Sequence, residues 1–271
     1  MIHVPKVFQP KINTVYPHEN YIEFERWFLE NCSCDVNGRE YLPILFCGYH
    51  VNNNYGQDTK AKYDLQAFVN ELDSSKKYYC ISQYDDGVGV DWKGKDVLEF
   101  NMSKKVGYPI PLMCQPHSYN VGGNRKYFAS FVGNKTHEIR SNVFSLEGVE
   151  GYYVSAINHN IHNYCRVISQ SIFGLCPRGY GINSFRIVEC LQYGTIPVYI
   201  SDEFIFPYNM DFEEYGVVIE KHDVNRIDEI LKGITPEQII KKQDKIQELY
   251  NSHFTYKGVG DRIIEYLCSL E

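Results

Sequence analysis

The segment from Ser171 to Ile200 constrains the fold of this chain more than any other part. It begins with a short apolar run, Ser171 to Cys176, that predicts a buried strand, and a loop with two glycines follows. Ser184 can cap the next helix, and Gly194 stands where a left-handed residue ends such a helix. A second apolar run, 195–200, follows at once. This order predicts a βαβ unit, whose two strands lie parallel in one sheet.

The same alternation of strands and helices continues elsewhere in the chain. The runs 41–47 and 77–82 are predicted strands, and the apolar positions within 63–72 recur at helical spacing. A stretch rich in proline and glycine between Gly107 and Gly123 breaks any regular element, so we place a lobe boundary there. We therefore expect an α/β fold. Its predicted parts are an N-terminal lobe of residues 1–122, a C-terminal lobe of residues 123–257, and a terminal helix, 258–271, that can pack back on the N-terminal lobe.

Composition and charge exclude several classes of protein. The net charge is −7 and the pI is about 5.7, so no basic field attracts nucleic acid. No stretch reaches the roughly 18 consecutive apolar residues of a membrane span, and the N-terminus lacks the apolar region of a signal peptide. The nine cysteines are scattered and odd in number, which favours free thiols. We expect a cytoplasmic protein with neither a nucleic-acid partner nor a membrane span.

The loop and helix of the βαβ unit carry residues suited to a nucleoside diphosphate. A glycine such as Gly179 in a loop that leads into a helix lets a diphosphate approach backbone N–H groups. Arg178 and Arg186 supply two cations, because a guanidinium can bind phosphate oxygens with two parallel hydrogen bonds. Glu189 lies three residues beyond Arg186 on the same helix face, where its carboxylate can accept ribose hydroxyls. An Arg–Glu pair on a solvated helix face is the alternative interpretation.

The whole string resembles the exostosin family, glycosyltransferase family 47. Its similar parts are Ser171 to Gly179 (a CPRG loop after a strand), Asn183 to Glu189 (an S-x-R-x-x-E helix), Gly194 to Val198 (a G-x-I-P-V strand) and the turn from Asp202 to Pro207. Upstream, Arg125 to Gly133 followed by Arg140 resembles the segment that opens the family's donor domain. The donor-binding residues implied by this resemblance are Gly133, Arg140, Arg178, Gly179, Asn183, Ser184, Arg186 and Glu189.

The resemblance also implies an architecture and an activity. The architecture is of the GT-B type, in which two Rossmann-like lobes face each other across a cleft, with the donor on the C-terminal lobe. The activity is an inverting transfer of a hexose or pentose from a nucleotide sugar, in most members a UDP-sugar, to a hydroxyl of an oligosaccharide or glycoside acceptor. No metal or other cofactor is required. Many members carry an N-terminal membrane helix, and its absence here leads us to expect a microbial or viral enzyme, which in the viral case works in the host cytoplasm.

An inverting single displacement needs one general base, usually a carboxylate, to deprotonate the acceptor hydroxyl. Asp85 and Asp86 follow the predicted strand 77–82, at the end where parallel sheets present ligand-binding residues. This stretch resembles the family's H-D-x-G motif, with Tyr84 in place of His and Asp85 at the position of the Asp. A plain Asp-Asp-Gly turn is an equal alternative. Other acids stay open as the base, namely Asp58, Asp64, Asp73 and Asp91.

Two further hypotheses compete with this interpretation. A metal-dependent GT-A transferase needs an acidic D-x-D motif to hold a divalent ion, and neither the Asp85–Asp86 pair nor the Asp202–Glu203 pair has that spacing. The alternative to an enzyme is a catalytically inactive exostosin-like module that binds carbohydrate or stabilises a partner. His50 and His117 lie in predicted loops and can bind the acceptor.

Overall fold

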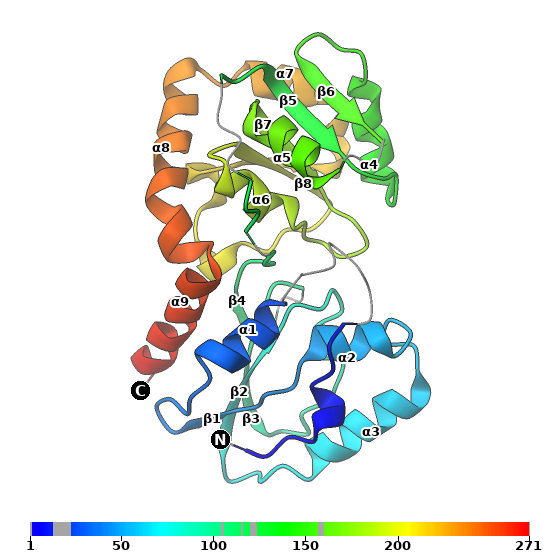
Figure 1. The fold of residues 1–271 in the computed structure, drawn as a ribbon, viewed down its shortest axis with the longest axis vertical. Coiled ribbons are helices and arrows are strands. Elements are labelled where there is room, and N and C mark those ends of the chain that lie inside the picture. Colours follow the sequence, from blue (N-terminus) through cyan, green and yellow to red (C-terminus); the bar gives the residue numbers. More distant parts are fainter. Residues whose placement is uncertain are drawn as a thin grey trace. The chain divides into compact units, whose positions relative to one another are not determined.

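A computed structural model describes residues 2–12, 23–103, 106–114, 116–119, 124–156 and 160–270. The chain divides into two compact units, the first comprising residues 1–115 and 256–271 and the second residues 116–255. Figure 1 draws both units, each of which contains its own sheet with helices packed around it. The expected lobe boundary between residues 122 and 123 lies outside the described residues.

The first unit is built on a four-stranded parallel sheet with the order β1-β2-β3-β4. Strand β2 (Lys77–Ser82) is buried from Tyr78 onward, which explains why its sequence is an unbroken run of apolar and aromatic residues. The other elements of this unit are the 3₁₀ turn η1 (Lys6–Phe8), the strands β1 (Arg39–Tyr41), β3 (Asp96–Asn101) and β4 (Tyr108–Pro109), and the helices α1 (Phe24–Asn31), α2 (Phe46–Asn52), α3 (Thr59–Asn70) and α9 (Tyr256–Ser269).

The run 41–47 does not form the strand that its apolar residues predict. Strand β1 ends at Tyr41, the N–H of Leu42 still reaches the carbonyl of Tyr79 at 2.9 Å, and α2 begins at Phe46. Pro43 has no N–H with which to continue the ladder, so the strand cannot extend across it. The prediction is therefore wrong beyond its first residue.

The terminal helix α9 packs in the first unit. Tyr256 meets Phe24 edge to face, with 5.4 Å between the ring centroids, and Tyr266 stacks on Tyr108 at 3.7 Å. Gly260 lies against the Trp27 ring, close enough that a Cβ there would come within 3.2 Å of it. Aromatic pairs of this kind contribute beyond the apolar area they bury, so the last helix helps to close the core around α1 and β4.

The second unit has a five-stranded parallel sheet with the order β6-β5-β7-β8-β9. Its strands are β5 (Tyr127–Val132), β6 (Tyr152–Ser155), β7 (Ser171–Pro177), β8 (Ile196–Ser201) and β9 (Val217–Glu220). The predicted βαβ unit is confirmed, because β7 and β8 are parallel neighbours joined through the helix α6 (Arg186–Gln192). Gly194 has a φ of +62°, the left-handed conformation expected just after this helix.

Helices and short turns surround this second sheet (Figure 1). They are α4 (Glu138–Val143), η2 (Phe144–Leu146), α5 (Ile161–Ser169), η3 (Pro207–Asn209), η4 (Phe212–Glu214), η5 (Lys221–Arg226), α7 (Ile227–Lys232) and α8 (Pro236–His253). Helix α8 packs against α6 and β8. It starts with a capping box, in which the Thr235 hydroxyl accepts the Gln238 N–H while the Gln238 side chain accepts the Thr235 N–H.

The structure also bears on the expected free thiols and on the expected lack of a membrane span. All nine cysteines are free, as their number and scatter predicted. Among the helices of the described residues, none combines the length and the apolar character that crossing a bilayer requires.

Candidate functional site

The strand order of the second unit creates a topological switch point between β5 and β7. Strands β5 and β7 are adjacent, but the chain leaves them in opposite directions across the sheet. It passes from β5 through α4 to β6 on one side, and from β7 through α6 to β8 on the other. In open parallel sheets, ligands bind in the crevice outside the carboxyl ends of the strands at such a point. Gly133 follows β5, and Arg178 and Gly179 follow β7. The fold therefore brings both predicted loops to one edge of the sheet.

Each glycine at this edge lies against a guanidinium. A Cβ on Gly133 would come within 3.1 Å of Arg186 Nη2, and a Cβ on Gly179 would come within 3.0 Å of Arg140 Nη2. Larger residues would therefore push these arginines aside. Glycine keeps the backbone open beside a positive charge, which is the environment that a phosphate group needs.

Arg186 is fixed by stacking as well as by hydrogen bonding. Its guanidinium carbon lies 4.7 Å from the centroid of the Phe131 ring and 6.0 Å from that of Tyr164. Nη2 donates to the carbonyl of Val132 at 2.5 Å, whereas the buried Nε has no hydrogen-bond partner among the described residues. The side chain is thus pre-oriented beside Gly133, with one buried donor not satisfied by the protein.

The other two arginines of the candidate site are joined to each other through the backbone. Arg140 donates from Nε to the carbonyl of Arg178 at 3.0 Å. Arg178 makes an ion pair with Asp202 and donates from Nη2 to the carbonyl of Tyr180 at 2.9 Å. The Asp202 carboxylate therefore offsets part of the positive charge of Arg178.

The loop between β7 and α6 contains Asn183 and Ser184. The Asn183 side chain accepts the Ser184 N–H at 2.9 Å, and its buried Nδ2 has no hydrogen-bond partner in the part of the chain that the structure describes. Ser184 makes only a weak form of the capping contact that the sequence predicts. Helix α6 begins at Arg186, and the residue before it, Phe185, already has helical dihedral angles and makes no side-chain cap. The Ser184 hydroxyl accepts only a long hydrogen bond, 3.4 Å, from the Arg186 N–H.

Glu189 is buried and accepts hydrogen bonds on both carboxylate oxygens. Oε1 lies 3.1 Å from His117 Nε2, and Oε2 accepts the hydroxyl of Tyr164, which lies in α5. Burial by itself raises the pKa of this carboxyl. The hydrogen bond from His117, the charge of Arg186 and the Tyr164 hydroxyl outweigh that effect and hold the pKa below its ordinary value. Glu189 is therefore an ionised carboxylate in a nearly dry environment, and the paired histidine nitrogen must carry a hydrogen.

Asp85 and Asp86 belong to the first unit, whereas the donor-site candidates all belong to the second. They follow β2, where Asp85 is half-buried and Asp86 is exposed. Tyr84 before them packs against His50, with 4.8 Å between the ring centroids and 31° between the ring planes. His50 lies in α2 rather than in a loop, and its buried ring bonds the Val88 carbonyl at 2.9 Å, so its predicted acceptor role finds no support in its position.

Three residues that matter here have no recognisable local signal. His117 and Tyr164 are 72 and 25 residues away from the glutamate they contact. Glu25 is a buried carboxyl that accepts the N–H groups of Gln83 (2.6 Å) and Cys47 (3.0 Å), which ties α1 to the segment bearing Asp85. Burial raises the pKa of Glu25 to about 8, against the opposing effect of these hydrogen bonds.

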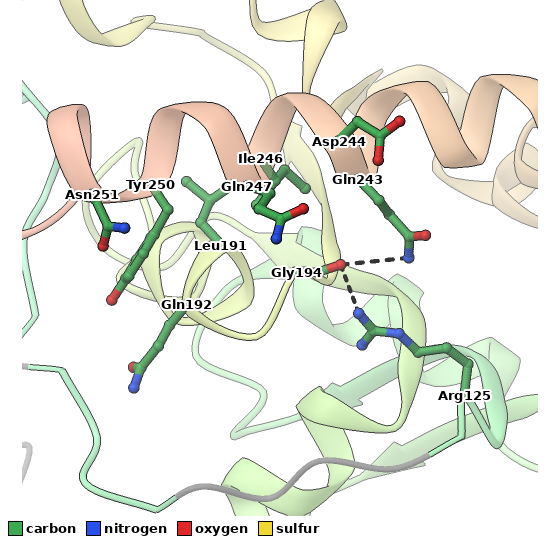
Figure 2. A pocket seen from close by; sticks show the side chains of 10 residues that line it. All are labelled: Arg125, Leu191, Gln192, Gly194, Gln243, Asp244, Ile246, Gln247, Tyr250 and Asn251. Carbon is green, nitrogen blue, oxygen red and sulfur yellow. Dashed lines mark hydrogen bonds between the residues drawn. The ribbon is translucent and has the colours of Figure 1, made fainter.

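A separate cavity of about 380 Å³ lies between α6 and α8, and Figure 2 shows its lining. Arg125 and Gln243 both donate to the carbonyl of Gly194 there, and Gln192 forms part of the wall. Arg125 precedes β5 and Gly194 precedes β8. This cavity is therefore at the amino ends of the strands, opposite the edge where Gly133 and Gly179 lie. The described residues contain no group of three or more side chains arranged to hold a metal ion.

Comparison with known proteins gives matches in both units. The exostosin GT47 domain matches residues 44–234. Probable beta-1,4-xylosyltransferase IRX10L of Arabidopsis thaliana is 39% identical over 82 residues, which cover 30% of this chain and 20% of that protein. A probable glucuronosyltransferase of Oryza sativa subsp. japonica is 38% identical over 82 residues, 30% of this chain and 19% of that protein. The exostosin-1 homolog of Caenorhabditis elegans is 23% identical over 292 residues, which cover 92% of this chain and 70% of that protein.

The chain thus matches only about a fifth of the length of the two plant relatives. The domain match is longer and extends over most of both units, each of which has a parallel sheet with surrounding helices. The prediction of an α/β fold is confirmed, because each unit has its own parallel sheet with helices around it. From the domain match over residues 44–234, the chain belongs to the exostosin family, glycosyltransferase family 47.

Proposed function

We propose that this chain is a glycosyltransferase that moves a sugar from a UDP-sugar to a hydroxyl of a glycan acceptor. The observation that carries the proposal is the cluster at the β5–β7 switch point, where two glycines lie against arginines and a buried carboxylate lies on the adjoining helix. The family to which the chain belongs, and the names of its relatives, support the same activity.

The residues of this cluster divide between the two parts of a nucleoside diphosphate. Gly133 and Gly179 give the diphosphate access to the backbone, and Arg140 and Arg186 supply positive charge beside them. Glu189 receives the ribose hydroxyls, because an ionised carboxylate accepts hydrogen bonds and offers about four acceptor positions. Arg178, Asn183 and Ser184 shape the loop between these groups.

The chemistry we propose is a single displacement with inversion. The acceptor oxygen attacks the anomeric carbon, its proton passes to a carboxylate base, and the bond between that carbon and the diphosphate oxygen breaks. The diphosphate leaves with the electron pair, and the arginines beside it offset the charge that develops. We assign the base to Asp85, with Asp86 as the second candidate, because both follow the end of β2. In this scheme the arginines take the role that a metal ion has in other transferases.

The free thiols fit a reducing compartment, so we propose that the enzyme works in the cytoplasm.

Mass spectrometry after incubation with a panel of UDP- and GDP-sugars and simple acceptor glycosides tests the proposal. We expect a product heavier by one hexose or pentose residue with at least one UDP-sugar. Asp85→Asn should abolish the product while UDP still binds in calorimetry. Normal turnover in Asp85→Asn together with loss of the product in Asp86→Asn would move the base to Asp86. A wild-type chain that binds UDP but forms no product with any acceptor would favour the inactive module. A chain that binds neither UDP nor GDP would exclude the donor site.

A further inference from the structure

The carboxylate of Glu189 is held from two sides by groups that lie on different elements. His117 belongs to the segment before β5 and contacts Oε1, whereas Tyr164 lies on α5 and contacts Oε2. The His117 side chain is only 4% exposed, and Tyr164 is partly buried. Each carboxylate oxygen therefore accepts one hydrogen bond from the protein before any ligand arrives.

An ionised carboxylate has about two acceptor positions on each oxygen, so the described residues leave one position on each for a ligand. Two donors placed side by side match this arrangement better than a single donor does. The neighbouring hydroxyls of a ribose are such a pair. A ligand that lacks one of them would leave a buried acceptor unpaired, which is costly where water has little access.

We propose that His117 and Tyr164 are positioning residues that hold Glu189 in one orientation, so that its two remaining acceptor positions take the 2′ and 3′ hydroxyls of the nucleotide. This inference rests on the proposed function and adds a selectivity to it. The site should discriminate ribonucleotides from 2′-deoxyribonucleotides, and the two positioning residues should be the source of that discrimination.

The placement of His117 is itself fixed by the helix that carries Glu189. Gln192, three residues further along α6, accepts the His117 N–H at 3.0 Å and donates to the His117 carbonyl at 2.7 Å. The His117 ring also meets the Tyr164 ring edge to face, with 6.2 Å between centroids. Helix α6 therefore sets both the carboxylate and the backbone of its histidine partner, so the distance between them is well defined.

The remaining charge near this carboxylate is consistent with a fixed ionised state. The Arg186 guanidinium lies over the Tyr164 ring at 6.0 Å and contributes to the lowered pKa of Glu189. Burial raises the pKa of Tyr164, so its hydroxyl keeps the proton that it donates. A purely structural role for these contacts would affect the stability of the chain but not its preference between two nucleotides.

The test is calorimetric titration of the full chain with UDP and with 2′-deoxy-UDP. We expect the wild type to bind UDP at least about tenfold more tightly than 2′-deoxy-UDP, because the deoxy ligand leaves a charged acceptor unpaired. Tyr164→Phe keeps the ring and removes only the hydroxyl, and we expect its preference to fall below about threefold. His117→Leu should behave in the same way, whereas His117→Gln, which keeps an N–H donor, should retain most of the preference.

Tyr152→Phe is the matched control. Tyr152 lies on β6, and its hydroxyl likewise donates to a carboxylate, that of Asp228, at 3.1 Å. It should leave the nucleotide preference at the wild-type value. A preference in Tyr164→Phe equal to that of the wild type, with both proteins folded by thermal unfolding, would overturn the inference and leave the proposed function standing. A wild type that binds neither nucleotide would overturn both.

Discussion

Arg125 joins three segments of the second unit, and its replacement should weaken that unit severely. Its guanidinium donates to five acceptors at distances between 2.7 and 3.0 Å, which are the carbonyls of Ser169, Ser171, Tyr193 and Gly194 and the hydroxyl oxygen of Thr195. These acceptors belong to the end of α5, the start of β7 and the connection from α6 to β8. One side chain thus holds the two strands that flank the donor loop.

The magnitude follows from the burial of these acceptors. Ser171 is fully buried and Ser169 is 6% exposed, so water cannot easily replace the guanidinium at their carbonyls. A buried acceptor left without a partner costs about 1–3 kcal/mol. The Ser169 carbonyl would lose the guanidinium, and the Ser171 carbonyl would keep only a long hydrogen bond, 3.3 Å, from the Thr195 hydroxyl, so we expect a loss of about 2–4 kcal/mol for Arg125→Met. The carbonyls of Tyr193 and Gly194 count for less, because Gly194 lines a cavity that water can enter. At about 2–4 °C per kcal/mol, the expected fall in Tm is roughly 4–16 °C.

Urea unfolding and thermal unfolding of the purified variant measure this loss. The matched control is Arg166→Met, which removes an exposed arginine from α5 and should change the free energy of unfolding by less than about 0.5 kcal/mol. Arg125→Lys should recover less than half of the loss, because an ammonium group cannot span acceptors on both sides as a planar guanidinium does. An Arg125→Met chain within 1 kcal/mol of the wild type would refute the reasoning.

Three further predictions concern other residues. Burial raises the pKa of Glu25 to about 8 from an ordinary 4.5. Between pH 4.5 and pH 8 the folded state therefore binds more protons than the unfolded state. The free energy of unfolding should then fall by about 1.4 kcal/mol per pH unit as the pH rises through this range. Urea titrations of the wild type and of Glu25→Gln across this pH range should show a shallower fall of the free energy of unfolding in the variant. The same fall in both proteins would contradict the raised pKa of Glu25. A Cβ on Gly174 would lie 2.2 Å from the Cys190 sulfur, so Gly174→Ala should lower the free energy of unfolding in urea by about 1–3 kcal/mol. Adding Cys190→Ala should recover most of this loss. Full stability of Gly174→Ala would contradict the expected clash with Cys190. Arg186→Lys keeps the charge but not the flat stacking on the Phe131 ring, so calorimetry should show UDP binding weaker by roughly tenfold, and unchanged binding would mean that charge alone suffices.

The parts of the fold that the sequence predicted well are those whose signals are local. Strand β7 is marked by its apolar run, and Gly194 by its place after the last helical residue. The structure differs from the prediction where a residue distant in sequence, or a single backbone group, determines the local conformation. Pro43 stops a ladder that the apolar run around it would otherwise continue. The capping contact expected at Ser184 is weak, because its hydroxyl lies 3.4 Å from the Arg186 N–H.

The candidate site shows the same division. Arg186 and Glu189 share one helix, so their spacing placed both side chains on one face, and the resemblance to the exostosin family then suggested that they bind the donor together. The environment of Glu189 was not accessible in this way, because Tyr164 lies on a preceding helix and His117 lies 72 residues away. No short-range pattern encodes such contacts. The position of His117 in a predicted loop suggested only that it binds the acceptor substrate. Glu25 is comparable, since its partner Gln83 is 58 residues away.

The most direct measurement of the central claim is a crystal structure of the chain with UDP bound. The account predicts that the diphosphate lies at the β5–β7 edge, within hydrogen-bond distance of the backbone of Gly133 or Gly179, and that the ribose hydroxyls contact the carboxylate of Glu189. UDP bound in the first unit, or in the cavity between α6 and α8 (Figure 2), with the β5–β7 edge empty, would contradict it.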